Sequence, residues 1–160
     1  MVDLACGHGL LAHVMLLLDD HSPCAVGVDV RIPPSATKVA NALVEVWPHL
    51  AGRVTLHQMA LEAFPLTRDD VVVSAHACGA LTDVVLDRAA SALARVSVMP
   101  CCHALKPGRT LDLEGWADGA LAMDLERAVR LRQRGYVIHT RHIPESITPK
   151  NRMLLGEPRA

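Results

Sequence analysis

The sequence has few aromatic residues: one phenylalanine, one tyrosine and two tryptophans among 160 positions. A hydrophobic core therefore has to be built mainly from valine, leucine and alanine. Apolar residues nevertheless make up 51% of the chain and charged residues 21%, a balance typical of a folded protein and not of a disordered one. This length is enough to bury one core, which predicts a single domain over residues 1–160.

Two kinds of targeting signal and a disulfide framework are also missing. No apolar run approaches the roughly 18 residues of a membrane span, and no basic and apolar leader marks the N-terminus as a secretory signal. The five cysteines are an odd number, none of them forms a C-x-x-C pair, and Cys101 and Cys102 are adjacent. We therefore expect a cytoplasmic protein that does not interact with membranes.

The charge is close to neutral, with a net value of −1, but it is unevenly distributed. Residues 1–80 carry 4 basic and 8 acidic side chains, whereas residues 81–160 carry 12 and 9. This mildly basic second half is compatible with an RNA partner. Lys150 and Arg152, in a predicted loop at the sheet edge, are the better candidates for phosphate contacts. Four other arginines are expected to form an exposed helical face: Arg127, Arg130, Arg132 and Arg134.

Short apolar runs alternate with segments of helical periodicity along the chain. Strands are predicted at residues 1–4, 25–30, 54–57, 70–74, 96–99, 136–143 and 152–156. Helices are predicted at residues 9–18, 82–94 and 116–133, with a further helix capped by Ser35 whose apolar face is Val39, Leu43, Val46 and Leu50. Repeated alternation of this kind predicts a doubly wound, Rossmann-like α/β sheet that is mostly parallel. The last two strands have no helix between them, so we expect them to pair antiparallel at one edge.

The opening stretch VDLACGHG places two glycines between the first strand and the first helix. Backbone amides and a helix N-terminus would then point at a ligand, and Gly7 and Gly9 would let the backbone approach it closely. Asp29 ends the second strand twenty residues after Gly9, where a carboxylate can bind ribose hydroxyls. Residues 7–12 also fit the dinucleotide pattern G-x-G-x-x-A, so the glycines alone leave two cofactors open, NAD(P) and S-adenosylmethionine.

Asp3 favours the second of these cofactors. S-adenosylmethionine enzymes commonly have an acidic residue in the pattern D/E-x-G-x-G-x-G, and here the first glycine of that pattern is replaced by Ala5. A single short domain also leaves no room for a second mononucleotide half and a substrate domain. Both observations count against a dehydrogenase.

Two further motifs follow the fourth and fifth predicted strands: HACGALTD at residues 76–83 and PCCH at residues 100–103. The carboxyl ends of neighbouring strands border the crevice where doubly wound sheets bind ligands. The paired motifs resemble a branch of class I methyltransferases that includes the eukaryotic tRNA acceptor-stem 2′-O-methyltransferases and related methyltransferase-like proteins. The resemblance runs from Asp3 to His103, and the TPKNR stretch at residues 148–152 extends it.

This resemblance implies a seven-stranded sheet in the order 3-2-1-4-5-7-6, S-adenosylmethionine as cofactor, and RNA as substrate with a tRNA ribose 2′-hydroxyl as acceptor. It also implies a set of cofactor-binding residues, in which Asp3, Gly7 and Gly9 hold the methionine end and Asp29 the ribose. That set is Asp3, Ala5, Cys6, Gly7, Gly9, Asp29, Val30, Met59, Ala60, Ser74 and His76. A ribose hydroxyl is a poor nucleophile, so a base is needed, and the catalytic candidates are His76, Asp83 and His103.

The motifs also contain zinc-ligand residue types, at His76, Cys78, Cys101, Cys102 and His103. No C-x₂₋₄-C pair anchors them, and adjacent Cys101 and Cys102 are expected to project differently. We therefore expect buried free cysteines and no metal. Two alternative functions remain: an NAD(P)-binding oxidoreductase, and a non-catalytic module that binds RNA or protein.

The resemblance further implies helices upstream of the first strand that cover the cofactor. Met1 lies almost on that strand. We expect either a minimal or truncated form, or a cover supplied by a partner protein or a second copy of the chain.

Overall fold

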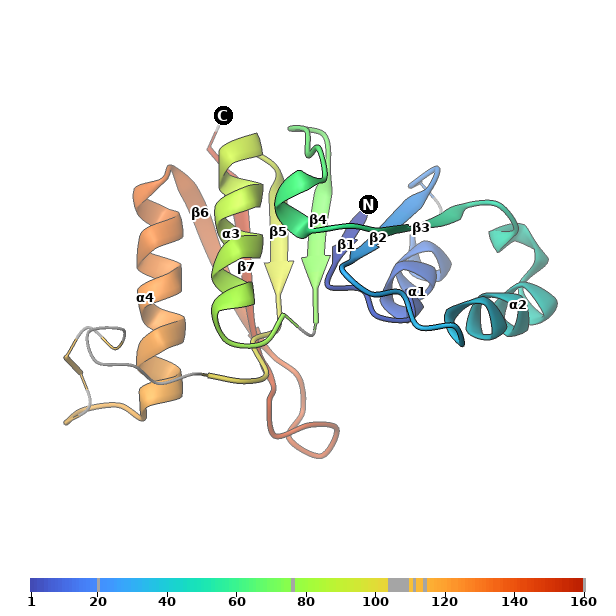
Figure 1. Cartoon of the computed structure of the whole chain (residues 1–160). Coiled ribbons are helices and arrows are strands. Elements are labelled where there is room, and N and C mark those ends of the chain that lie inside the picture. Colours follow the sequence, from blue (N-terminus) through green and yellow to red (C-terminus); the bar gives the residue numbers. More distant parts are fainter. Residues whose placement is uncertain (20, 76, 104–109, 111, 114, 160) are drawn as a thin grey trace.

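The computed structural model describes the chain except for residues 20, 76, 104–109, 111, 114 and 160. Within the described residues, seven strands form one sheet (Figure 1). The strands are β1 (Val2–Leu4), β2 (Ala25–Asp29), β3 (Val54–Gln58), β4 (Val71–Ser74), β5 (Arg95–Val98), β6 (Tyr136–His142) and β7 (Arg152–Pro158).

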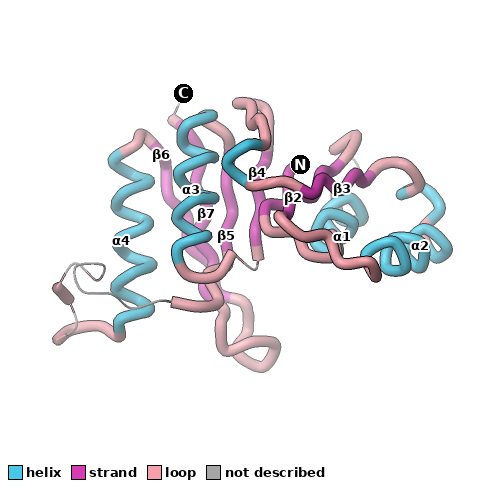
Figure 2. The backbone as a smooth tube through the Cα atoms, in the orientation of Figure 1, coloured by secondary structure: helices cyan, strands magenta, loops and turns pink. Residues whose placement is uncertain are grey.

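Four α-helices and two short 3₁₀ helices connect the described strands (Figure 2). The α-helices are α1 (Leu10–Leu18), α2 (Ala36–Val46), α3 (Ala80–Ala92) and α4 (Gly119–Gln133), and the 3₁₀ helices are η1 (Pro48–Leu50) and η2 (Leu61–Ala63). In the described part of the chain, none of the helices has the length and apolar character needed to cross a lipid bilayer.

The sheet has the order β3-β2-β1-β4-β5-β7-β6, which confirms the expected doubly wound topology. Strands β1 to β5 are parallel to their neighbours in this group. Strand β7 lies antiparallel to both β5 and β6, so the reversed strand is next to the edge and β6 forms the edge itself. The direct β6–β7 connection explains this reversal, because a parallel pair would require a longer crossover.

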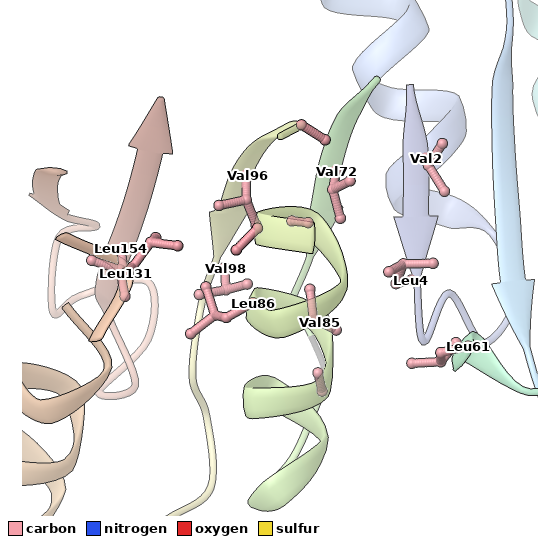
Figure 3. Packing of buried hydrophobic residues seen from close by; sticks show 14 of the residues in the cluster. Val2, Leu4, Leu61, Val72, Val85, Leu86, Val96, Val98, Leu131 and Leu154 are labelled. Atoms are coloured by element: carbon pink, nitrogen blue, oxygen red, sulfur yellow. The ribbon is translucent and has the colours of Figure 1, made fainter. Parts of the chain in front are cut away.

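The core divides between the two faces of the sheet. On one face, strand residues such as Leu4 and Val72 belong to one buried cluster with Val85 of α3 and Leu131 of α4 (Figure 3). On the other face, α1 packs against β2 and η1 in a smaller cluster. Successive strand residues point to opposite faces, so Asp3, between the core residues Val2 and Leu4, points away from the larger cluster.

The boundaries of two helices differ from the sequence expectation. Helix α4 begins at Gly119 and not at residue 116, because the carboxylate of Asp118 accepts a hydrogen bond from the amide of Leu121 at 3.0 Å and so caps the helix. Helix α3 begins at Ala80, two residues before the predicted start. Both corrections come from local chemistry at a helix N-terminus, where the periodic pattern carries little information.

The prediction for the second helix was right about the position of its N-cap but wrong about the capping hydrogen bond and about where the helix ends. Ser35 is the first flanking residue but makes no capping hydrogen bond, and its hydroxyl lies 2.8 Å from Nε2 of His8 instead. At the other end, α2 stops at Val46, which is 64% exposed. Pro48 disfavours helical backbone in the residue before it, so Leu50 is buried from η1 and not from α2.

Candidate active site

A pocket of about 800 Å³ opens at the carboxyl ends of β1, β2 and β4. Its walls come mainly from the β1–α1 loop and the first turns of α1. The lining residues are Asp3, Ala5, Cys6, Gly7, His8, Leu10, Leu11, Val14, Asp29, Val39, Ala75 and Leu81. The opening motif of the sequence thus forms the wall of the largest of the described cavities.

The β1–α1 loop has an alternating backbone conformation. Ala5, Gly7 and Gly9 have φ values of 62°, 53° and 73°, in the left-handed region that favours glycine. A Cβ on Gly9 would lie 2.6 Å from Cδ2 of Leu56, whereas one on Gly7 would meet no protein atom within 4 Å. Gly9 is therefore required for packing as well as for φ, and Gly7 leaves open space beside the pocket.

Asp3 is the most unusual carboxylate of the pocket. It is 2% exposed, and its Oδ2 atom is buried without a hydrogen-bond partner. Burial raises the pKa of Asp3 from 3.8 to about 7, the nearby charge of Asp29 adds to this, and the backbone amide of Ala12 lowers it in part. An unpartnered buried oxygen is costly for a folded chain, which marks this position as one that a polar or cationic ligand completes.

Asp29 lies at the end of β2, as predicted, and its carboxylate accepts a hydrogen bond from the β1–α1 loop. Its Oδ2 accepts a hydrogen bond from the amide of Gly7 at 2.9 Å, and its Oδ1 accepts one from the amide of Arg31 at 3.1 Å. Each carboxylate oxygen has a further lone pair. The carboxylate therefore holds the glycine loop in place and can still accept hydrogen bonds from a ligand.

The Cys6 thiol is protonated at neutral pH. Burial raises its pKa to about 12, and the charges of Asp3 and Asp29 add to the shift. Only a thiolate is a strong nucleophile, so Cys6 acts in this pocket as a small packing group.

Gly9 does not line the pocket, and neither do four other predicted cofactor-binding residues. Val30 is 66% exposed just after β2, and Met59 and Ala60 follow β3. The hydroxyl of Ser74 donates to the carbonyl of Leu4 at 2.6 Å and so links β4 to β1. The remaining predicted residue, His76, lies outside the described residues.

The two catalytic candidates that the structure describes, His103 and Asp83, belong to one network of charged residues between α3 and α4. Nε2 of His103 lies 2.7 Å from Oδ1 of Asp124, and the His103 side chain is 4% exposed. Asp83 accepts a hydrogen bond from Nε of Arg127 at 3.0 Å. Arg127 also donates to Asp124 at 3.2 Å and to the carbonyl of Gly79 at 2.8 Å.

This network corrects the expectation of an exposed arginine face on α4. Arg127 is 1% exposed, because it faces α3 and is neutralised there by carboxylates of both helices. Arg130 is half-buried and Arg134 is exposed, and both pair with Asp87. Arg132 is exposed, as expected.

Asp124 is the residue that sequence reasoning missed. Its second oxygen accepts from Nε of Arg152 at 2.8 Å, so one carboxylate joins α4, β7 and the loop after β5. Asp124 and Arg127 are three positions apart, a spacing at which helix side chains meet, and this was the available signal. The contact also shows that Arg152 is already paired within the chain, whereas Lys150 forms no ion pair with the described residues.

A family model described as a methyltransferase domain matches residues 1–106. The chain belongs to this methyltransferase family. It is also 30% identical to a glutathione S-transferase C-terminal domain-containing protein homolog from Drosophila pseudoobscura pseudoobscura, over 98% of this chain. The match covers 32% of that relative, so the chain spans about a third of its length.

Solved structures of methyltransferases share the fold. The tRNA m1A22 methyltransferase TrmK of B. subtilis superposes with a TM-score of 0.61 at 17% identity, over 99% of this chain and 59% of that one. Magnesium protoporphyrin IX methyltransferase (ChlM) of Synechocystis PCC 6803 was solved with bound SAH. It superposes with a TM-score of 0.61 at 17% identity, over 99% of this chain and 73% of that one. At such identities the likeness concerns the fold.

The residues of the pocket fit S-adenosylmethionine, the methyl donor of this class of enzyme. Its sulfonium and ammonium groups are cationic, and the pocket offers the unpartnered oxygen of Asp3. Its ribose carries two hydroxyls, and Asp29 offers free lone pairs at the end of β2. Open space over Gly7 leaves the loop accessible to such a ligand.

Proposed function

We propose that this chain transfers the methyl group of S-adenosylmethionine to RNA, with a tRNA ribose 2′-hydroxyl as the acceptor. The observation that carries the methyltransferase assignment is the pocket in which Asp3 keeps a buried oxygen without a partner and Asp29 ends the next strand. When bound, S-adenosylmethionine supplies an electrophilic methyl group on a positively charged sulfur.

The residues of the pocket have distinct parts in holding the cofactor. Asp3 binds its cationic amino acid end, and the backbone of the β1–α1 loop, fixed by Gly7 and Gly9, lies against it. Asp29 accepts hydrogen bonds from the ribose while it keeps the amide of Gly7 in place. The main contribution to the rate is then the alignment of the acceptor oxygen with the methyl group.

Among the described candidates, His103 is better suited than Asp83 to accept the proton of the hydroxyl. Asp83 is already engaged in an ion pair with the buried Arg127, with Nε of the arginine 3.0 Å from its Oδ1. The ring of His103 is oriented by Asp124 through Nε2, and its Nδ1 has no partner among the described residues. An imidazole held by a carboxylate through one nitrogen is the usual arrangement of a catalytic base.

RNA as the substrate rests on the HACGALTD and PCCH motifs and on cations at the same sheet edge. Arg141 near the end of β6 and Lys150 in the β6–β7 loop are both exposed, and within the described residues neither forms an ion pair. Cations in a loop at the mouth of a site can bind the phosphates of an RNA. TrmK, which shares the fold, is a tRNA methyltransferase.

Calorimetry and label transfer test the proposal. The folded protein is titrated with S-adenosylmethionine, S-adenosylhomocysteine and NADH, and is then incubated with methyl-labelled donor and either total RNA or a protein extract. We expect heat with the first two ligands and label in RNA. Heat with NADH alone would indicate an oxidoreductase, cofactor binding without transfer a non-catalytic module, and label in protein a different acceptor.

The acceptor atom follows from the chemistry of the labelled RNA. A methylated 2′-oxygen cannot attack the adjacent phosphodiester, so label in an alkali-resistant dinucleotide indicates ribose methylation and label in mononucleotides indicates a base. Lys150→Ala and Arg141→Ala should lower transfer to RNA without changing S-adenosylmethionine affinity. The exposed Arg159→Ala, just after β7, is the matched control.

A further inference from the structure

Three thiols gather where the chain leaves β4 and β5. The Sγ atoms of Cys78 and Cys101 are 3.2 Å apart, those of Cys101 and Cys102 are 3.8 Å apart, and all three lie within 4.8 Å of one another. This corrects two sequence expectations. The adjacent cysteines project toward the same point, and Cys78 and Cys102 are exposed and not buried.

The backbone holds this arrangement in place. The amide of Gly79 donates to the carbonyl of Cys102 at 2.9 Å, and the amide of Met99 donates to the carbonyl of Ser74 at 3.0 Å. The two loops that carry the thiols are thus linked to each other before any ligand binds. Gly79 is in turn fixed to α4 through its carbonyl and Arg127.

The distances agree better with a shared metal ion than with a disulfide. Zn–S bonds of about 2.3 Å in a tetrahedron place two sulfurs about 3.8 Å apart. The Cys101–Cys102 separation already has this value, and the Cys78–Cys101 separation would open by roughly 0.6 Å. A disulfide of about 2.05 Å would instead require that same pair to close by more than about 1 Å.

The thiol cluster lies at the start of a helix and close to the cofactor pocket. Cys78 precedes Gly79, the N-cap of the thirteen-residue helix α3, and the N-terminus of a helix carries a partial positive charge. Hydrogen bonds with the thiols of Cys101 and Cys102 raise the pKa of Cys78 to about 12, so a metal ion has to displace the proton of this thiol. The site is close to the cofactor pocket, because Ala75 and Leu81, on either side of Cys78 in the chain, line that pocket.

We propose that Cys78, Cys101 and Cys102 bind one Zn²⁺ ion as three thiolates, with the fourth coordination position open. Three protein ligands and one open position are typical of zinc sites that bind a water or a substrate atom. Soft thiolate donors select zinc over the hard cations Mg²⁺ and Ca²⁺. The ion would fix the loops after β4 and β5 beside the pocket, and each thiol would release its proton to solvent on binding.

Metal titration of the reduced chain tests this assignment. Cobalt(II), which reports thiolate coordination through its visible absorption, is added and then displaced by Zn²⁺. We expect one equivalent to bind and the spectrum of a tetrahedral thiolate site. Cys78→Ser, Cys101→Ser and Cys102→Ser should each weaken binding by more than about tenfold. The exposed Cys24→Ser is the matched control and should bind as the unaltered chain does.

A second measurement uses the unaltered chain and so does not depend on how the variants fold. Alkylation with a mass-tagged reagent, followed by peptide mapping, should show that Zn²⁺ protects the three clustered thiols and leaves Cys24 reactive. Magnesium at the same concentration should protect none of them. The proposal is overturned by absence of binding to the reduced chain, by binding that the three substitutions leave unchanged, or by a Cys78–Cys101 disulfide that forms in the presence of Zn²⁺.

Discussion

The carboxylates beside the two halves of the sheet differ in their partners. Beside β1 and β2, Asp3 keeps one oxygen without a partner among the described residues, and Asp29 accepts hydrogen bonds from the backbone amides of Gly7 and Arg31. Between α3 and α4, Asp83 and Asp124 are both paired with the buried guanidinium of Arg127. We call the first pair the open carboxylates and the second the paired carboxylates.

The composition of the two halves explains the contrast. Residues 1–80 contain 4 lysines and arginines for 8 acidic residues, whereas residues 81–160 contain 12 for 9. The second half can therefore neutralise its own carboxylates, and α3 and α4, which lie side by side in Figure 1, are joined in this way. The open carboxylates form no ion pair with any residue that the structure describes. A cationic ligand with hydroxyl groups is the natural complement to them.

The largest expected effect concerns the paired carboxylates. Arg127→Met removes a guanidinium whose side chain is fully buried. Asp83 then keeps its ion pair with Arg130, and Asp124 keeps its ion pair with Arg152. Breaking a buried pair leaves an uncompensated charge, so we expect a loss of about 3 kcal/mol in the free energy of unfolding. Urea denaturation measures this loss.

Arg130→Met is the matched control on the same helix. Arg130 is 34% exposed and forms ion pairs with Asp87, with Glu126 and, at 3.6 Å, with Asp83. For such a partly exposed arginine each pair contributes less than about 1 kcal/mol. If the two substitutions destabilise the chain equally, the contrast between buried and surface pairing is wrong.

Asp29→Ala probes the open carboxylates. Hydrogen bonds to a charged group contribute about 1.5–3 kcal/mol, so the affinity for S-adenosylmethionine should fall by about 10- to 100-fold. Asp87→Ala removes a carboxylate that is paired with arginines and should leave this affinity unchanged. Calorimetry of both variants, with thermal denaturation as a check of folding, gives the comparison. Equal affinities in the two variants would contradict a cofactor role for Asp29.

The pH dependence of cofactor binding probes Asp3. Burial raises its pKa to about 7, and a cationic ligand favours the ionised carboxylate. Binding therefore releases a proton below this pKa, and the affinity should rise about fivefold from pH 6 to pH 7 and little above pH 8. Asp3→Asn should weaken binding at pH 8 and flatten the profile. A profile that Asp3→Asn leaves unchanged would assign the titration to another group.

The same carboxyl should affect folding in the opposite direction. Its folded-state pKa lies above the unfolded value of 3.8, so between those values the folded chain holds a proton that the unfolded chain has lost. The contribution to stability is therefore complete below about pH 4 and is lost as the pH rises to about 7. Without cofactor, Asp3→Asn should be more stable than the unaltered chain at pH 8.

The fold was predictable because its main signals are local and repeated. Alternating apolar strands and helices indicated the doubly wound sheet, and the missing helix between the last two strands indicated their antiparallel pairing. The errors lie where one residue decides a boundary. Asp118 caps α4, and Pro48 ends α2, and in both places the periodic pattern continues past the true end.

The site was predictable only where it is built from one continuous stretch. Asp3 and Gly7 line the pocket because a single strand–turn–helix positions them. Arg127 was predicted as exposed, because nothing in the spacing of α4 reveals that Asp83 faces it from α3. The convergence of three thiols likewise depends on the pairing of β4 with β5, which brings two distant motifs together.

The smallest expected effect compares a strained alanine of the cofactor loop with an alanine in an ordinary backbone conformation. Ala5 has a φ of 62°, which costs a residue with a Cβ about 1–2 kcal/mol, whereas glycine loses about 0.5–1 kcal/mol in conformational entropy. Ala5→Gly should therefore stabilise the chain by up to about 1 kcal/mol and leave cofactor affinity unchanged. Ala60→Gly, at an ordinary φ of −65°, should destabilise it by about 0.5–1 kcal/mol. Denaturation of the two variants measures the difference. If Ala5→Gly destabilises the chain as Ala60→Gly does, the loop is not strained, and the alanine in place of the usual glycine has no energetic consequence.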